Sequence, residues 1–210
     1  MRNTYIVGLI AILAVLIAST SHQTRAQSPK GYSVGEAIAS FSLKNVDGRM
    51  IGPANYQGQK GLIVVFSSNH CPFSKAYEDR VQELNRRYSS QGFPVVAIMP
   101  NDPSAYEEDS YEQMKTRASE KNFSYPYLLD ESQSVAKAFG ASRTPHVYVL
   151  KRSGDRFTVE YIGAIDDNPQ DASGVQRRYV EEAVNNLLAG RPVAVTTTKA
   201  IGCAIKWKNM

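Results

Sequence analysis

The chain has 210 residues, with 24 lysines and arginines against 20 acidic residues, and a formal net charge of +4. This length suits one domain with a sizeable hydrophobic core and is too short for two comfortable ones. The charges are scattered along the chain and form no basic stripe. That distribution excludes the electrostatic pattern of a nucleic-acid-binding surface.

The first 26 residues follow the order of a secretory signal. Residues 6–18 are an uninterrupted apolar run, and the polar stretch after it ends in Thr24-Arg25-Ala26, with small residues placed as at a cleavage site. The run is shorter than the roughly 20 residues that span a bilayer. We therefore expect a cleaved signal over residues 1–26 and an exported, periplasmic or extracellular protein with no membrane contact afterwards. A retained N-terminal anchor is the minor alternative, and a buried helix is the third.

Two features predict the start of the fold. Residues 41–46 alternate apolar and polar side chains, Asp47-Gly48 is a strong turn signal, and a return strand begins at Met50. These residues predict an N-terminal hairpin. Residues 62–66 are a continuous apolar run bounded by glycine and serine, which is typical of a strand buried on both faces of a sheet.

Helices and strands alternate after this run. Apolar residues spaced by three and four predict a helix from Phe73 to Gly92, and Ser110 with Gln113 forms a capping box. The other expected elements are strands over 93–99, 127–129, 145–151 and 157–165, and helices over 110–122, 131–139 and 174–189. We predict an α/β fold over residues 27–190, with a central mixed sheet flanked by helices. A tail, residues 191–210, follows and carries Cys203.

Cys71 stands where the buried strand gives way to the helix. Pro72 suits the first helical position, because the N–H that it lacks would have no partner there. Cys71 is then the N-cap residue, and its sulfur faces unpaired N–H groups and the positive end of the helix dipole. Both lower the pKa of the thiol and favour the thiolate, which is the reactive nucleophile. The alternative is a buried cysteine that acts as a small hydrophobe.

A second signal lies near residue 145. Arg143-Thr144-Pro145-His146 precedes the apolar run of residues 147–150. A proline at the start of a strand removes a hydrogen-bond donor from the ladder, so it must serve the local geometry.

Several motifs together resemble one known family. They are residues 66–80 around Cys71, Asp109-Ser110, Thr144-Pro145-His146, residues 161–168 and the closing stretch 202–208. Over residues 34–208 the chain resembles the redoxin branch of the thioredoxin superfamily, and within it the peroxiredoxin-like subgroup of the alkyl hydroperoxide reductase/thiol-specific antioxidant family. The resemblance implies a thioredoxin-like fold, a thiol-dependent oxidoreductase activity and a cis-proline at Pro145 beside the reactive cysteine.

Two departures from related proteins leave the activity open between peroxide reduction and disulfide exchange. A dithiol thioredoxin site has a second cysteine three positions after the first, where this chain has Ser74. True peroxiredoxins carry a proline and a threonine seven and three residues before the cysteine, where this chain has Val64 and Ser68. Ser68 keeps a hydroxyl that could bind peroxide, whereas Val64 offers nothing equivalent.

The expected site follows from these motifs. Catalytic roles are expected for Cys71, for Cys203 as the thiol that resolves an oxidised Cys71, for Arg143 as a thiolate-stabilising group as in peroxiredoxins, and for Ser68. Substrate contacts are expected from Pro72, Thr144, Pro145 and His146. We expect no metal and no cofactor, and as partners a peroxide or disulfide substrate and an external thioredoxin-like thiol reductant.

Each supporting residue has an alternative interpretation. Arg143 could be a surface residue, Arg80 is better explained as an ion-pairing residue, and His70 could tune the thiol or simply be solvated. Cys203 could be a free or packed thiol in a tail that Trp207 pins to the core. Two other functions remain open. One is a copper-binding assembly factor that uses Cys71, His70, His146 and Cys203, since thiolates suit Cu(I). The other is a redox-inert binding module on the same fold.

Overall fold

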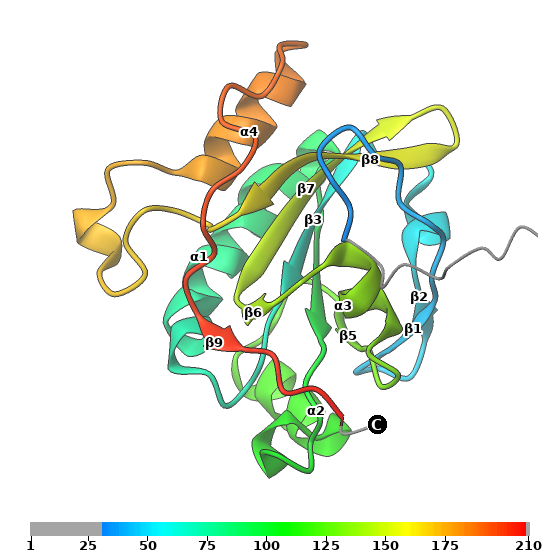
Figure 1. Cartoon of the computed structure of the whole chain (residues 1–210), viewed down its shortest axis with the longest axis vertical. Helices are drawn as coiled ribbons and strands as arrows, with labels where there is room; N and C mark the ends of the chain where they lie inside the picture. The colour runs from blue at the N-terminus through cyan, green and yellow to red at the C-terminus, as the bar shows by residue number, and fades with distance from the viewer. Residues whose placement is uncertain (1–30, 209–210) are drawn as a thin grey trace, which may run out of the picture.

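The computed structural model describes residues 31–208, so the predicted signal over residues 1–26 lies outside the described part (Figure 1). Four helices form, α1 (Pro72–Tyr88), α2 (Tyr111–Glu120), α3 (Ser134–Phe139) and α4 (Tyr179–Leu188). The strands are β1 (Leu43–Asn45), β2 (Met50–Ile51), β3 (Gly61–Phe66), β4 (Val95–Met99), β5 (Tyr127–Leu129), β6 (Arg143–Thr144), β7 (His146–Ser153), β8 (Arg156–Gly163) and β9 (Cys203–Ala204). Within residues 31–208, none of the helices has both the length and the apolar character needed to cross a membrane.

Seven strands form one mixed sheet in the order β2-β1-β5-β4-β3-β7-β8. β3, β4 and β5 are parallel, whereas β7 runs antiparallel to β3 and β8 antiparallel to β7. The short strands β6 and β9 form a separate two-stranded sheet. The predicted α/β architecture with a central mixed sheet flanked by helices is confirmed.

The central strand β3 is buried on both faces, as its continuous apolar sequence predicted. Successive side chains of a strand point to opposite faces. Ile63 and Val65 therefore join the core cluster that contains the apolar sides of α1, α2 and α4. Leu62, Val64 and Phe66 join the second cluster, on the face that α3 covers. This double burial fixes the direction in which β3 delivers the chain to α1.

The N-terminal hairpin forms as expected. β1 pairs antiparallel with β2, with Leu43 opposite Ile51, and Gly48 adopts φ +87° in the turn between them. That conformation is readily available to glycine and rare for other residues. β1 also pairs with β5, so the hairpin extends one edge of the main sheet.

The structure corrects one expectation in the C-terminal part. The helix predicted to begin at residue 174 begins at Tyr179, because the preceding loop uses its backbone N–H groups elsewhere: Gln176 N donates to the Asp167 carboxylate at 3.0 Å, and residues 172–174 form only a single 3-10 turn. The tail after residue 190 contains the short strand β9, which pairs with β6 (Figure 1).

The packing around β3 gives a stability prediction. An added Cβ at Gly61 would lie 2.2 Å from the Leu150 carbonyl oxygen and 2.1 Å from the Phe93 ring. We expect Gly61→Ala to lower the free energy of unfolding by roughly 1–3 kcal/mol through overpacking. Urea unfolding followed by circular dichroism measures it. Gly58→Ala is the matched control, since a Cβ there meets no atom within 4 Å; equal midpoints for the two variants would contradict the prediction.

Candidate functional site

The chain turns from β3 into α1 through residues 67–71, and this turn carries Cys71. Cys71 is the N-cap of α1, with an extended backbone (φ −69°, ψ 120°), and Pro72 occupies the first helical position. Both placements confirm the prediction from sequence. The Cys71 side chain therefore lies beside the N–H groups of the first helical turn, which have no partner inside the helix.

The Cys71 sulfur is fully buried against the Thr144-Pro145 turn. None of the Cys71 surface is exposed, and Cys71 Sγ donates a hydrogen bond to the Thr144 carbonyl oxygen at 3.0 Å. The Thr144–Pro145 peptide bond is cis, as the family resemblance implied. The fold thus brings the two sequence motifs, Cys71-Pro72 and Thr144-Pro145, together at one edge of the sheet.

Cys203 reaches the same place from the tail. β9 pairs antiparallel with β6, with Cys203 directly opposite Thr144, and both cysteines are free thiols. Both cysteines therefore lie at Thr144, and each thiol shifts the pKa of the other. Two cysteines that are 132 positions apart in the sequence are therefore neighbours in the fold.

The shifts differ in sign. Burial raises the pKa of the Cys71 thiol, but hydrogen bonds from the Cys203 thiol, from the backbone N–H groups of Ser74 and Cys203, and from the Thr144 hydroxyl lower it by more, so the pKa is lowered overall. Burial, and then the hydrogen bond and charge of Cys71, raise the pKa of Cys203 to about 11. Of the two thiols, Cys71 therefore ionises at the lower pH.

A buried carboxylate holds the turn in front of Cys71. Asp109 is fully buried, and its Oδ1 accepts from the backbone N–H groups of Asn69 (2.7 Å) and His70 (3.1 Å). Its Oδ2 accepts from His70 Nδ1 at 2.5 Å, and the His70 ring stacks on Tyr106 with centroids 4.0 Å apart. Asp109 therefore fixes the two residues that precede the cysteine, and His70 is a packed, hydrogen-bonded residue rather than a solvated one.

The same carboxylate is connected to the tail. Asn101 Nδ2 donates to Asp109 Oδ2 at 2.8 Å, while Asn101 Oδ1 accepts from Lys206 N at 2.9 Å. Gln133 adds two bonds, from its Nε2 to the Lys206 carbonyl oxygen and from Lys208 N to its Oε1, each 2.8 Å long. The segment that carries Cys203 is thus anchored by buried amides on the body of the domain.

Other predicted site residues take different contacts. The Ser68 hydroxyl lies 3.1 Å from the Thr144 hydroxyl. Arg143 Nη1 donates to the Gly202 carbonyl oxygen at 3.0 Å, so this arginine contacts the tail. Within residues 31–208 no hydrogen bond joins Arg143 to Cys71. Arg80 forms the expected ion pair, with Asp166 at 2.7 Å.

His146 is buried and lies against the Tyr148 ring, with ring centroids 4.9 Å apart. Its Nδ1 accepts a long hydrogen bond, 3.5 Å, from the backbone N–H of Ser142. Burial lowers its pKa to about 4, so the imidazole is neutral near pH 7. A substrate contact by His146 stays a prediction.

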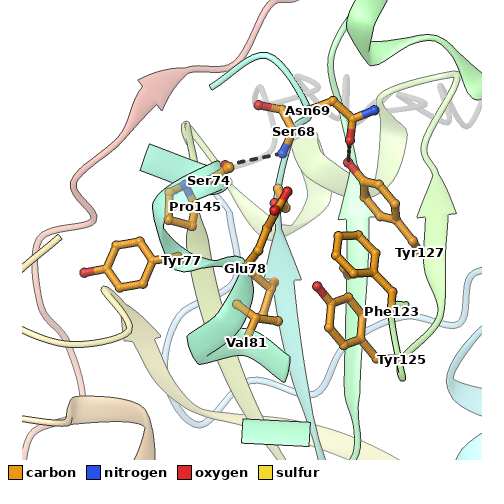
Figure 2. A pocket seen from close by; sticks show the side chains of 13 residues that line it. Ser68, Asn69, Ser74, Tyr77, Glu78, Val81, Phe123, Tyr125, Tyr127 and Pro145 are labelled. Carbon is orange, nitrogen blue, oxygen red and sulfur yellow. Dashed lines mark hydrogen bonds between the residues drawn. The ribbon is translucent and has the colours of Figure 1, made fainter. Parts of the chain in front are cut away.

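A small cavity lies beside the turn, and its volume is about 10 Å³ (Figure 2). Ser68, Ser74, Glu78 and Pro145 are among the residues that line it. Such a volume has room for about one water molecule. The cavity is therefore too small for an organic substrate.

The described residues offer no obvious metal centre. Within residues 31–208, no group of three or more histidine, cysteine, aspartate or glutamate side chains is placed to hold a metal ion. His70, one of the ligands of the copper alternative, is instead bonded to Asp109.

Sequence reasoning missed the residues that hold the site together. Asp109 appeared only as part of a family motif, and Asn101 and Gln133 gave no local signal, because their partners lie in distant segments. The glycine directly before Cys203 was the one available hint, since a glycine beside a functional residue often marks a close backbone approach.

A comparison with protein families agrees with this geometry. A profile described as "AhpC/TSA family" matches residues 34–160, which is more than half of the 210 residues. The chain belongs to the AhpC/TSA family. As an AhpC/TSA protein with thiol-disulfide oxidoreductases and peroxiredoxins among its relatives, it is a thiol-dependent oxidoreductase.

Two curated relatives represent these two activities. The chain is 22% identical over 148 residues to the thiol-disulfide oxidoreductase ResA of Halalkalibacterium halodurans, which covers 70% of this chain and 80% of the relative. It is 24% identical over 153 residues to the chloroplastic peroxiredoxin Q of Populus jackii, covering 64% and 67%. The relatives therefore leave the choice between the two activities open.

Solved structures place this AhpC/TSA chain among thioredoxin-like folds. An uncharacterized conserved protein from Geobacillus kaustophilus is 36% identical, with a TM-score of 0.79, over 86% of this chain and 95% of that one. The thioredoxin domain of a thiol-disulfide oxidoreductase from Bacteroides vulgatus is 15% identical with a TM-score of 0.51, over 63% and 91%, which supports the fold alone. The predicted thioredoxin-like fold is confirmed.

Because each thiol shifts the pKa of the other, removal of the Cys203 thiol should change the pKa of Cys71. In Cys203→Ser the thiol that donates to the Cys71 thiolate is replaced by a more weakly acidic hydroxyl, so we expect the pKa of Cys71 to rise. A titration of the ¹³Cβ chemical shift in protein labelled at cysteine measures it without a reagent that must reach the buried sulfur. In the unsubstituted chain we expect a midpoint below the ~8.5 of free cysteine. A midpoint unchanged by the substitution would show that the thiols are not coupled.

Buried His146 predicts a pH dependence of stability. Its pKa is about 4 in the folded chain and about 6.5 when unfolded. Between these values the unfolded chain binds the extra proton, so stability falls as the pH drops from 6.5 to 4 and then levels off. In His146→Asn this loss should be smaller by on the order of 3 kcal/mol, measured by urea unfolding at several pH values. Parallel curves for the two proteins would refute the assignment.

Proposed function

We propose that Cys71 and Cys203 form the redox couple of a dithiol–disulfide exchange enzyme, with Cys71 as the nucleophile and Cys203 as the second thiol. The observation that carries the proposal is that both cysteines meet at Thr144: Cys71 Sγ donates to its carbonyl oxygen at 3.0 Å, and Cys203 lies opposite it on β9. The pKa of Cys71 is lowered there and that of Cys203 is raised. This arrangement supplies from the tail the second thiol that Ser74 does not provide in the helix.

The reaction proceeds by two successive thiol–disulfide exchange steps. The Cys71 thiolate attacks one sulfur of a partner disulfide, forms a mixed disulfide, and releases the other partner sulfur as a thiolate. Cys203 then loses its proton and attacks the Cys71 sulfur of the mixed disulfide. The partner leaves fully reduced, the chain holds a Cys71–Cys203 disulfide, and two electrons have passed to the partner. An external dithiol reductant returns the couple to its thiol form.

The electrostatics of the pair control the order of these steps. The charge on Cys71 is one of the causes that hold the pKa of Cys203 at about 11, so Cys203 stays protonated while Cys71 is a thiolate. In the mixed disulfide the Cys71 sulfur carries no charge. That contribution then disappears, the pKa of Cys203 falls, and the second nucleophile becomes available only after the first step.

Peroxide reduction is the second candidate, and the similarity to peroxiredoxin Q favours it. In that reaction the Cys71 thiolate attacks the O–O bond and becomes a sulfenic acid, and Cys203 condenses with it to a disulfide with loss of water. The contacts of the site favour exchange. The Ser68 hydroxyl is 3.1 Å from the Thr144 hydroxyl, and Arg143 is bonded to the tail rather than directed at the sulfur.

The proposal includes an exported protein. The apolar run and small residues of positions 1–26 support a cleaved signal, with a thioredoxin-like domain over residues 27–190 and the Cys203-bearing tail over 191–210. An oxidising compartment would supply the disulfide-bonded partners that the reaction requires. N-terminal sequencing of the exported protein, expected to begin near residue 27, tests this part.

Two variants test the couple. We expect Cys71→Ser to abolish reduction of insulin disulfides by dithiothreitol-recycled protein, and Cys203→Ser to accumulate a mixed disulfide on Cys71, detectable by mass spectrometry, while turnover falls by about tenfold or more. Turnover of Cys203→Ser at the original rate would exclude Cys203 as the second thiol. Hydrogen peroxide consumption that depends on both cysteines, without insulin reduction, would instead establish the peroxidase. Loss of neither activity in Cys71→Ser would support a redox-inert module.

A further inference from the structure

The tail lies against β6 in the manner of a bound extended peptide. β9 pairs antiparallel with β6, with Cys203 opposite Thr144 and Ala204 opposite Arg143. The ladder continues beyond it with a hydrogen bond from Ile205 N to the Ser142 carbonyl oxygen at 3.1 Å. β6 pairs with β9 alone in this small sheet. The edge beside Cys71 is therefore a surface that binds an extended strand through its backbone.

Close packing restricts the residue before the cysteine. An added Cβ at Gly202 would lie 2.2 Å from the Thr144 carbonyl oxygen, 2.7 Å from the Thr144 carbonyl carbon and 3.0 Å from Pro145 N. All three are backbone atoms of the turn that holds Cys71, so they cannot move aside as a flexible side chain can. The Gly202 carbonyl oxygen also accepts a bond from Arg143 Nη1. A strand with any side chain at this position cannot lie in the same register.

The second restriction is two residues after the cysteine. Ile205 is buried, at 4% exposure, and belongs to the core cluster that also contains Phe66 and Val135. Ala204, between Cys203 and Ile205, is exposed. The alternation is that of a strand with one face on the domain. The edge thus accommodates a glycine, a cysteine, an unrestricted residue and an apolar residue, in that order.

The tail also closes access to the nucleophile. Cys71 is completely buried, whereas Cys203 on the strand above it is half-buried. A sulfur of a partner protein cannot approach the Cys71 sulfur while β9 is in place. A protein partner must therefore occupy the position of β9 when its disulfide reacts.

We propose that the tail is a tethered ligand of this edge, and that a partner protein docks there through an extended segment with glycine directly before its reactive cysteine and an apolar residue two positions after it. The inference rests on the proposed role of Cys71 and names the partner's recognition sequence. The partner's cysteine takes the place of Cys203 opposite Thr144. Cys71 attacks its sulfur, and the partner's other cysteine leaves as a thiolate. The returning tail then brings Cys203 to resolve the mixed disulfide.

The test uses the full chain with Cys203→Ser, so that only Cys71 reacts. Two probes are the thionitrobenzoate mixed disulfides of a peptide with the sequence of residues 201–205 and of the same peptide with alanine in place of glycine. Attack on the peptide sulfur releases coloured thionitrobenzoate. A third, small probe is dithiobis(nitrobenzoate). Each probe is tested on the Cys203→Ser parent and on the parent that also carries Gly202→Ala, which should displace the tail. The control is the parent with Gly58→Ala, because a Cβ at Gly58 meets no atom within 4 Å.

We expect Gly202→Ala to react with the glycine peptide about tenfold or more faster than the parent does, and to prefer it to the alanine peptide by about tenfold, as removal of a backbone clash predicts. The Gly58→Ala variant should behave as the parent. Circular dichroism checks the fold, and if Gly202→Ala is unfolded, Ile205→Ser replaces it as the tail-releasing variant.

The opposing outcomes separate the two proposals. Equal rates with both peptides, together with rapid reaction of dithiobis(nitrobenzoate), would overturn the recognition sequence and leave the role of Cys71 standing. A dimer that forms with increasing concentration, without any preference between the peptides, would also overturn the recognition sequence. It would indicate that the edge of β6 binds the tail of a second copy of the chain. Failure of Cys71 to react with any probe in the tail-releasing variant would overturn the proposed function itself.

Discussion

The arrangement of the site depends on Thr144, which contacts both cysteines. Its carbonyl oxygen accepts the hydrogen bond of Cys71 at 3.0 Å, and its strand position pairs with Cys203. The cis bond to Pro145 begins at the same residue. Thr144 thereby holds both Cys71, through its carbonyl oxygen, and Cys203, through the strand pairing.

A second constraint is the hydrogen-bond network of the Asp109 carboxylate, which joins the turn before Cys71 to the tail. Asp109 holds the turn before Cys71 through the backbone N–H groups of Asn69 and His70, and Asn101 joins this carboxylate to Lys206 in the tail. A buried carboxylate needs hydrogen-bond donors on its oxygens. Because the donors to Asp109 come from the turn before Cys71 and from Asn101, which also binds the tail, the turn and the tail are held together. The site is consequently one hydrogen-bonded unit built from segments that are far apart in the sequence.

The site combines a lowered pKa of the Cys71 thiol with complete burial of that residue. A thiolate exposed to an oxidising surrounding is open to irreversible oxidation, and Cys71 is completely buried under the strand that carries its partner thiol. Ser74 and Thr144, two of the residues that lower its pKa, are themselves buried, so they act where water does not screen them. The tail lies beside Cys71 and carries the second cysteine of the chain.

The sequence by itself determined the elements whose signals are local. The apolar run of β3, the Cys71-Pro72 helix start and the hairpin around Gly48 depend on nearest neighbours, and all three formed as expected. The start of α4 was wrong because hydrogen bonds to Asp167 in the preceding loop delay it.

Only the tertiary structure decided the role of the tail. The strand at Cys203 spans two residues and pairs with Thr144, and the residues after it are held by Asn101 and Gln133, so no periodic pattern could reveal it. Burial and hydrogen bonding between distant segments are properties of the folded chain, and the shift of a thiol pKa follows from those neighbours rather than from the residues beside it.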